Sequence, residues 1–284
     1  MRRIKFLKLE LASIREFLTM IEAYEEISAI RMRKVKKSIL ERREFMQGLN
    51  EAFGYIVQAY KIYKNSLKGK DKKEILNTNG KTVSVYLSSN TGLYGDVIGS
   101  TFDLFENDIR KEETDVVVVG KMGKKYYDSS GLKKTYKYFD MSDNGIDEPN
   151  IKKLLKYVVS YTEVVVYHGV FRSILYQEAS KTHVTGEVMK IEQSLDSYDT
   201  RFLFEPSVER VAEHFEKQIA SLIFEQTVFE SSLSKFASRM VSLDKAADSI
   251  GSKIGFLGIS LKKSKHADIN SNLQSSIFGG LLWR

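Results

Sequence analysis

The spacing of apolar residues near the N-terminus predicts one long helix. Apolar side chains recur at alternating steps of four and three residues, which is the spacing of a coiled-coil seam. The first positions of this seam are Leu7, Leu11, Ile14, Leu18 and Ile21. Between Glu22 and Lys34 the pattern weakens and reads as Tyr24, Ile27 and Ile30. The seam resumes as Val35, Ile39, Arg42, Met46, Leu49, Phe53, Ile56, Tyr60, Tyr63 and Leu67. Residues 1–67 are therefore expected to form a helical arm.

A second stripe with the same spacing occupies the C-terminal part of the chain. Its positions are Leu222, Gln226, Phe229, Leu233, Phe236, Met240, Leu243, Ala247, Ile250, Ile254, Leu257 and Leu261. Upstream, Pro206 is followed by Ser207, which is suited to cap a helix, and by Glu209, whose charge favours a first helical turn. Helices of compact domains average about a dozen residues. Arms this long predict an antiparallel coiled coil formed by segments 1–67 and 205–284.

The segment between the arms, residues 68–204, has the pattern of a small α/β domain. It opens with a polar, Lys-rich linker at 68–80. Short β-branched or alternating runs predict strands at 83–88, 114–119, 134–139 and 163–167, helices at 96–110 and 149–160, and possible edge strands at 183–191 and 200–204. Because strand and helix alternate, the fold class is α/β, with a Rossmann-like sheet between two helical arms.

Composition restricts the chemistry open to this chain. It contains no cysteine, which excludes disulfides, thiolate metal sites and cysteine nucleophiles. No run approaches the roughly 18 to 20 apolar residues of a membrane span, and the N-terminus lacks an apolar signal core, so we expect a cytoplasmic protein. The formal charge of +7 favours an acidic partner, such as nucleic acid, anionic lipid or an acidic protein surface.

Candidate catalytic and cofactor sites are weak. The loop Ser88–Asp96 resembles a phosphate-binding turn, but it lacks the Gly-Lys-Ser/Thr of a P-loop, and Asp96 would place negative charge beside a phosphate. The run Asp140–Gly145 begins like a calcium loop, yet Ile151 stands where a glutamate is required. No catalytic residue, cofactor or metal ion is therefore expected. We instead expect structural turns at Gly92, Gly95, Gly120 and Gly123.

Histidines and serines give no stronger signal. No two of the four histidines have the spacing of metal ligands on one helix, and no serine lies in a Gly-x-Ser-x-Gly elbow. Within the second arm, Gly251, Gly255 and Gly258 each cost up to about 1 kcal/mol relative to alanine. Close approach to a partner and a looser helix end both explain these glycines.

The densest positive charge of the chain lies in the first arm, at residues 31–37 (RMRKVKK). Such a run is either a solvated helix face or a surface for an acidic partner. Nucleic-acid binding is less favoured, because aromatic residues for base stacking are not interleaved with the charges.

Five segments, in order along the chain, resemble the gamma subunit of the F-type ATP synthases. ISAIRMRK at 27–34 is similar to the family's VAAAKMRR, and SNTGLYGD at 89–96 to its SDRGLCGG loop. VVVGKMGKKYY at 117–127 is similar to the strand and turn VVGRKG. FEPS at 204–207 and SRMVSLDKAAD at 238–248 resemble YEPS and ARMVAMxxATD. Together these segments span nearly the whole chain.

The resemblance implies a non-catalytic rotor shaft. In that family the terminal helices lie as an antiparallel coiled coil inside a ring of alternating alpha and beta subunits. The α/β domain lies near the epsilon subunit and the membrane rotor ring. The shaft couples ATP turnover in the hexamer to rotation. The implied partners are thus alpha-like, beta-like and epsilon-like subunits, with attachment to a rotor ring or another transducer left open. The implied location is cytoplasmic, peripheral at the inner face of the cell membrane.

Contacts with the catalytic hexamer are implied at Arg31, Met32, Arg33, Lys34, Lys36, Lys37, Arg239, Met240, Lys265, His266, Asn270 and Asn272. The chain departs from the family beside these positions. The family's Lys-Ala-Met-Lys is Glu22-Ala-Tyr-Glu25 here, which reverses two charges. The family's RQAAITxE aligns with KHADINSN at 265–272 and loses its Arg, Gln, Thr and Glu.

These departures suggest a divergent member and leave other functions open. One alternative is the shaft of a repurposed F-type-like ATPase that drives motility or export. From other classes, the alternatives are a small nucleotide-binding α/β enzyme with helical extensions and a basic coiled-coil protein that binds nucleic acid.

Overall fold

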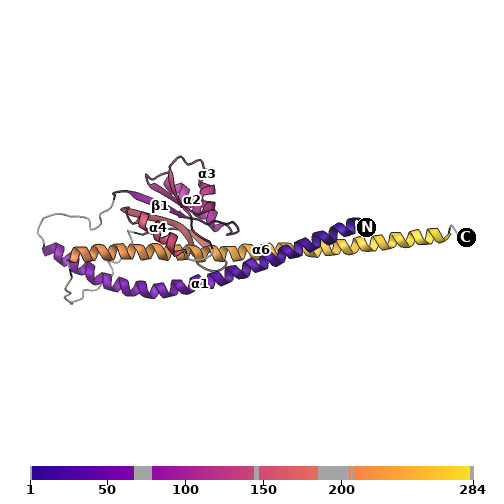
Figure 1. Cartoon of the computed structure of the whole chain (residues 1–284), viewed down its shortest axis with the longest axis horizontal. Helices are drawn as coiled ribbons and strands as arrows, with labels where there is room; N and C mark the ends of the chain where they lie inside the picture. Colours follow the sequence, from indigo (N-terminus) through magenta and orange to yellow (C-terminus); the bar gives the residue numbers. More distant parts are fainter. Residues whose placement is uncertain (1, 67–78, 144–146, 185–204, 206, 282–284) are drawn as a thin grey trace. The chain divides into compact units, whose positions relative to one another are not determined.

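The computed structural model describes residues 2–66, 79–143, 147–184, 205 and 207–281 (Figure 1). Two long helices lie at the ends of the chain, α1 over Arg2–Ser66 and α6 over Val208–Leu281. These helices confirm the two predicted arms. The chain divides into two compact units, one of Met1–Ser28 with Arg239–Arg284 and the other of Ala29–Ser238. Each long helix contributes to both units, so the unit borders differ from the borders 67 and 205 expected from the sequence.

In the unit of Met1–Ser28 and Arg239–Arg284, the two helices pack along the predicted seam. Leu7 and Leu11 of α1 are buried against Leu257 of α6, with further apolar contact from both helices. Tyr24, further along α1, lies against Arg239, which comes earlier in α6. The helices of this unit therefore run antiparallel.

The seam predicted between Glu22 and Lys34 is wrong. Tyr24, Ile27 and Ile30 are 41–52% exposed. The four-three step instead continues from Ile21 to Ser28, which is 2% exposed and donates its hydroxyl to the main-chain oxygen of Tyr24 at 2.8 Å. Because the hydroxyl finds its acceptor within the helix, a small polar residue fills the seam without an unsatisfied donor.

In the unit of Ala29–Ser238, the seam of α1 continues with a polar member. Val35 and Ile39 are buried in an apolar core that also contains Phe229 of α6. At the next position, the Arg42 guanidinium lies 4.2 Å from the centroid of the Phe229 ring and 2.5 Å from a carboxylate oxygen of Glu225. The predicted positions Met46, Leu49, Phe53, Ile56, Tyr60, Tyr63 and Leu67 lie outside the described side chains.

The α/β domain of this unit contains a five-stranded sheet with the order β3-β2-β1-β4-β5. Its strands are β1 Thr82–Leu87, β2 Asp115–Val119, β3 Tyr136–Phe139, β4 Glu163–Phe171 and β5 Gln177–His183. The first four strands are parallel, and β5 is antiparallel to β4. The helices between strands are α2 Val97–Ile109, α3 Lys121–Ser129 and α4 Glu148–Val158. The predicted Rossmann-like alternation is confirmed.

Two elements of the domain differ from the expectation. The observed edge strand, β5, ends at His183. Of the edge strands expected at 183–191 and 200–204, residues 185–191 and 200–204 lie outside the described residues, so these two expectations stay predictions. The strand QEASKTH contains one apolar residue and is partly exposed, so it carries no hydrophobic alternation. Helix α3 was not predicted, because few of its side chains are apolar and it buries only Gly123 and Tyr127.

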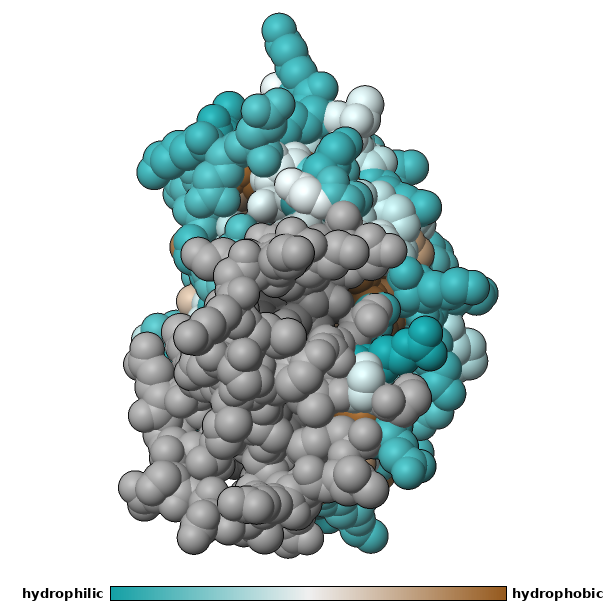
Figure 2. Space-filling view, turned by 90° about the vertical axis from the view of Figure 1, so that its left-hand side faces the viewer, coloured by the Kyte–Doolittle hydropathy of each residue, from teal (hydrophilic) through white to brown (hydrophobic). Residues whose placement is uncertain are grey.

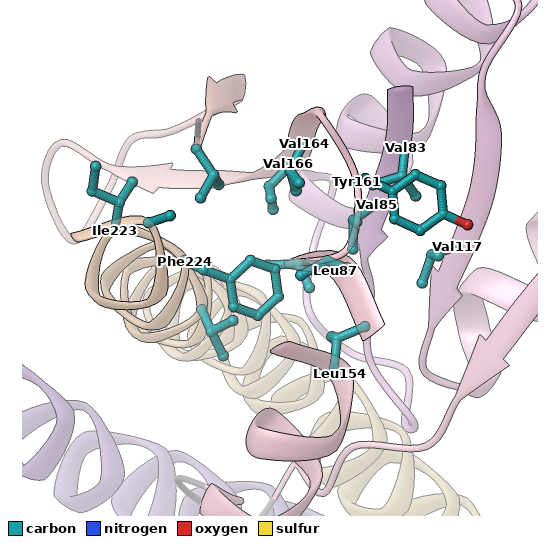
Figure 3. Close-up of a cluster of buried hydrophobic side chains, with 14 of the residues drawn as sticks. Val83, Val85, Leu87, Val117, Leu154, Tyr161, Val164, Val166, Ile223 and Phe224 are labelled. Carbon is teal, nitrogen blue, oxygen red and sulfur yellow. The ribbon is translucent and has the colours of Figure 1, made fainter. Parts of the chain in front are cut away.

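Apolar cores cover both faces of the sheet. On one face, Ile223 and Phe224 of α6 and Leu154 of α4 point toward the valines of β1 and β4 (Figure 3). On the other face, α2 and α3 bury an aromatic cluster that includes Tyr86 and Phe105. Strand β2 contributes Val117 and Val119 to the first core and Val116 and Val118 to the second. Burial on both faces explains the uninterrupted valine run.

Helix α6 buries more in this unit than the predicted seam. Phe229, Leu233 and Phe236 follow the seam and join the aromatic core. A second set packs on the opposite sheet face, namely Ile219, Ala220, Ile223, Phe224 and Val228. Gly169 of β4 permits this approach, because a Cβ there would lie 2.6 Å from the Ser234 hydroxyl oxygen. In this unit α6 is therefore part of the domain core as well as a coiled-coil partner.

Candidate functional site

The basic cluster of α1 is divided between two faces of the helix. Arg31 is partly buried and donates from Nη1 to the main-chain oxygen of Asp143 at 3.4 Å. Met32 packs against the aromatic core. The other predicted members, Arg33, Lys34, Lys36 and Lys37, are exposed, and Lys37 pairs with Glu41 on the same helix at 3.8 Å. Arg31 and Met32 thus face the α/β domain, and four cations face outward.

The predicted contact residues on α6 also differ in exposure. Arg239 is 9% exposed, and its guanidinium lies 5.4 Å from the ring centroid of Tyr24. Met240 is partly buried. The remaining predicted residues, Lys265, His266, Asn270 and Asn272, are exposed. The predicted residues belong to two compact units, those of α1 to the unit of Ala29–Ser238 and those of α6 to the unit that includes Arg239–Arg284.

Sequence reasoning missed a row of exposed apolar side chains beside the seam of α1. Phe6, Phe17, Met20, Tyr24 and Ile27 are 41–65% exposed. Each directly precedes a position of the four-three seam, so they lie along one flank of the helix. On α6 a further exposed set is formed by Ile269, Leu273, Ile277 and Phe278. Phe17, Met20, Tyr24 and Ile27 follow one another at steps of three and four residues, whereas Glu10 and Ser13 separate them from Phe6. Exposed apolar rows of this kind mark surfaces for partners. The sequence signal for this row is a second set of apolar residues in α1, most of them spaced by three or four, each one residue before a seam position.

The face drawn in Figure 2 contrasts with these rows. Its described side chains are mostly hydrophilic, and hydrophobic surface appears there only in small patches.

The β1–α2 loop, residues 88–96, is closely packed against the start of α3. Gly120 has φ +88°, and a Cβ there would lie 2.7 Å from the main-chain oxygen of Ser89. A Cβ at Gly123 would lie 2.8 Å from the Ser88 Cβ. Gly95 has φ +59°, a conformation that favours glycine, whereas a Cβ at Gly92 would meet open space. Gly95 and Gly120 thus meet a dihedral or packing constraint outside the helices. Gly123 meets a packing constraint inside α3 and does not form the expected turn.

A carboxylate of the chain itself occupies the amides that resemble a phosphate cradle. Oδ2 of Asp143 accepts from the main-chain N–H groups of Asn90 and Thr91 at 2.8 and 2.7 Å. It also accepts from the Thr91 hydroxyl at 3.0 Å. The Asn90 side chain is held by Asp140 and by the main chain of Met141. The loop therefore presents bound carboxylate rather than free N–H groups, which disfavours phosphate binding there.

Two buried titratable groups lie near the carboxyl ends of β1 and β4. The ammonium group of Lys235 on α6 is enclosed and donates to the main-chain oxygen of Ser88 at 2.8 Å. Burial lowers the pKa of Lys235, and the charge of Asp143 opposes this effect. Burial likewise lowers the pKa of His168 on β4 to about 4. The described contacts of His168 are to the main-chain oxygen of Gly169 and the hydroxyl of Thr182, and that of Lys235 is to the main chain of Ser88.

In the ranges that the structure describes, no three histidine or acidic side chains converge as metal ligands. None of the described helices combines the length and the apolar character of a membrane span.

Comparison with known proteins gives one consistent result. A family model described as ATP synthase matches residues 3–281. The ATP synthase gamma chain of Xanthomonas campestris pv. campestris (strain B100) is 24% identical over 288 residues, which covers 96% of both chains. The ATP synthase gamma chain of Geotalea daltonii is 22% identical over 291 residues and covers 98% of both chains.

Solved structures show the same fold at low identity. The rotor of the Euglena gracilis mitochondrial ATP synthase in rotational state 1 superposes with a TM-score of 0.63 at 12% identity, covering 94% of this chain and 99% of that chain. The central stalk and c-ring of the Tetrahymena thermophila enzyme gives a TM-score of 0.55 at 16% identity, covering 80% and 99%.

Two long terminal helices joined to a Rossmann-like domain give this chain the fold of a subunit in the rotor of an ATP synthase. The chain belongs to the ATP synthase gamma family, because the family match spans both arms and the domain between them. It is accordingly a central-stalk subunit and not a catalytic one.

Proposed function

We propose that this chain is the central rotor shaft of an F-type rotary ATPase and couples ATP turnover in a ring of alpha-like and beta-like subunits to rotation. The observation that carries the proposal is the family match over residues 3–281, which includes both arms and the domain. The exposed cations and apolar rows on the arms are the surfaces that would meet the ring.

The partners and the location of the chain follow from the same proposal. The solved structures with this fold include a central stalk with a c-ring and an assembly of OSCP, F1 and c-ring. By analogy, the α/β domain would meet an epsilon-like subunit and a membrane rotor ring. The complex would lie at the inner face of the cell membrane, with this chain as a peripheral cytoplasmic component.

The arms have the asymmetry that such a shaft requires. The apolar row beginning at Phe6 lies along one flank of α1, while Arg33, Lys34, Lys36 and Lys37 form an exposed cationic segment further along the helix. A ring of similar subunits around such a shaft meets a different surface at each position. A turn of the shaft therefore changes the contacts, and with them the relative energies, of each catalytic site.

Co-purification tests the proposal directly. A tagged chain expressed in its native cell should bring down alpha-like and beta-like subunits with ATPase activity, and a chain that purifies alone would refute it. Recovery of those subunits with a transducer other than a rotor ring would instead favour the repurposed shaft.

A charge-matched pair of variants then tests the surface on α1. Replacing Arg33, Lys34, Lys36 and Lys37 with alanine should change the ATPase rate of the complex by about tenfold, or about 1.4 kcal/mol in the barrier. The control replaces four exposed lysines of the α/β domain, Lys121, Lys124, Lys125 and Lys133. Equal effects of the two variants would show that net charge, and not the α1 surface, governs the rate.

A further inference from the structure

Helix α6 and Asp143 hold the β1–α2 loop by opposite kinds of hydrogen bond. From α6, Lys235 Nζ donates to the main-chain oxygen of Ser88 at 2.8 Å, and Ser238 Oγ donates to that of Tyr94 at 2.6 Å. Between these two carbonyl groups, the Asp143 carboxylate accepts the main-chain N–H groups of residues 90 and 91. Donors on the helix thus bind the carbonyl groups of the loop, and one carboxylate binds its amides.

The same loop also connects to α3 and α1. The main-chain N–H of Lys121 donates to the Asn90 side-chain oxygen at 2.9 Å, and that of Met122 donates to the Ser89 main-chain oxygen at 2.8 Å. On the other side, Arg31 of α1 donates to the main-chain oxygen of Asp143. One short loop and one aspartate therefore link α1, α6 and the helix-covered sheet within a single compact unit.

The hydrogen bonds of the loop resist sliding and rotation of α6 against the sheet, which its apolar contacts resist only weakly. Apolar burial is non-directional, so it opposes separation of helix and sheet more strongly than a small slide or rotation. Hydrogen bonds weaken steeply when their angles change, and those to charged groups are the stronger ones. The bonds made by Lys235 and Asp143 are of this charged kind. They are therefore suited to fix the angle and register of α6 against the sheet.

We propose that Asp143 is a positioning residue that locks the two long helices to the α/β domain through the β1–α2 loop, so that domain and helices turn together. This inference rests on the proposed function, because a chain that transmits torque has a use for such a lock. The negative charge of Asp143 also offsets the burial of the Lys235 ammonium group, which ties the two contacts energetically.

Hydrogen exchange on the isolated full-length chain tests whether Asp143 holds the β1–α2 loop. Asp143→Ala removes the acceptor of two amides, so exchange at Asn90 and Thr91 should accelerate by about tenfold or more. Asp143→Asn keeps an acceptor oxygen without the charge and should give an intermediate result. The matched control is Asp103→Ala, an exposed aspartate on α2, which should leave both amides unchanged. Unchanged exchange in Asp143→Ala would overturn the proposal.

Spin labels test whether the loop positions the helix. The chain has no cysteine, so Gln218→Cys on α6 and Lys125→Cys on α3, both exposed, label two sites specifically. Asp143→Ala should broaden the distance distribution between the labels, and Asp103→Ala should not. Faster exchange with an unchanged distribution would overturn the lock.

A variant that fails to fold does not end the test. Thr91→Val removes one of the three bonds to the Asp143 carboxylate and should give a smaller change of the same sign in both measurements. Both readings use the isolated chain, so they are independent of assembly. A broadened distribution in a chain that never binds alpha-like and beta-like subunits would support the lock and refute the shaft.

Discussion

His168 on β4 is a buried neutral imidazole, and acid should destabilise the domain through it. The residue is 1% exposed. Its Nδ1 lies 3.2 Å from the main-chain oxygen of Gly169, and its Nε2 lies 2.9 Å from the Thr182 hydroxyl. Since a carbonyl oxygen can only accept, Nδ1 carries the proton and Nε2 accepts from the hydroxyl. Burial lowers the pKa of His168 from 6.5 to about 4.

The sign and size of the effect follow from this lowered pKa. The unfolded chain binds a proton on His168 near pH 6.5, whereas the folded chain resists protonation until about pH 4. Stability is therefore complete above pH 6.5 and falls as the pH drops from 6.5 toward 4. At about 1.36 kcal/mol for each pKa difference of one, the full loss is about 3 kcal/mol, most of it reached by about pH 4.5.

The acidic groups with shifted pKa values act in a different range. Hydrogen bonds from Lys181 and from the main chain of Ser142 lower the pKa values of Asp108 and Asp147 below their usual 3.8. The stability that these carboxylates contribute is present above that value and is lost mainly below it. The interval from about pH 6.5 to 4.5 thus isolates His168 from both of them.

Urea unfolding followed by circular dichroism, at constant ionic strength between about pH 7.5 and 4.5, measures the effect. His168→Gln removes the titrating group and should abolish most of the pH dependence in this interval. The control Gln177→Ala lies on the neighbouring strand β5 and removes no titrating group, so it should keep the wild-type dependence. Equal pH dependence in wild type and His168→Gln would refute the reasoning.

Three other predictions concern packing. Gly120→Ala should lower the free energy of unfolding by about 2 kcal/mol or more. Gly131→Ala should lower it by less, because both glycines have positive φ but, of the two, only Gly120 has backbone atoms within 3 Å of an added Cβ. Thermal unfolding of the two variants therefore separates the cost of the steric clash from that of the dihedral strain. A Cβ at Gly255 meets open space, so Gly255→Ala should stabilise the isolated chain by about 1 kcal/mol, and an unchanged melting temperature would contradict this. The half-buried Arg42–Glu225 pair should show a coupling energy of about 1 kcal/mol or more in a double-mutant cycle with Arg42→Met and Glu225→Gln. Additive effects of the two substitutions on the free energy of unfolding would show that the pair has no net attraction.

Regular patterns were the part of the fold that sequence reasoning could predict. The valine runs of β2 and β4 were identified as buried strands, because burial on both faces leaves no polar alternation. The four-three stripe located both long helices for a similar reason, since one face of each must leave water. Strand β5 and helix α3 were missed, because edge positions and exposed surface require few apolar residues.

The candidate site was predictable only in part. The cationic run of α1 was found, but its sequence does not show that Arg31 turns toward the domain while Arg33 and Lys34 face outward. In the sequence, Asp143 belongs only to a run that begins like a calcium loop and lacks its glutamate. Its contact with residues 90 and 91 joins segments that lie far apart in the chain, and local spacing carries no signal for such a pair.

The sequence by itself determined the helical arms, the alternation of strands and helices between them and the family, because these depend on periodicity and ordered motifs along the chain. The tertiary structure decided which side of each helix is covered. Ser28 lies in the seam and Ile27 outside it, since the seam is set by the partner helix rather than by the hydrophobicity of single residues. It also decided that Asp143 fills the loop amides, because a hydrogen bond between distant segments exists only once the chain has folded.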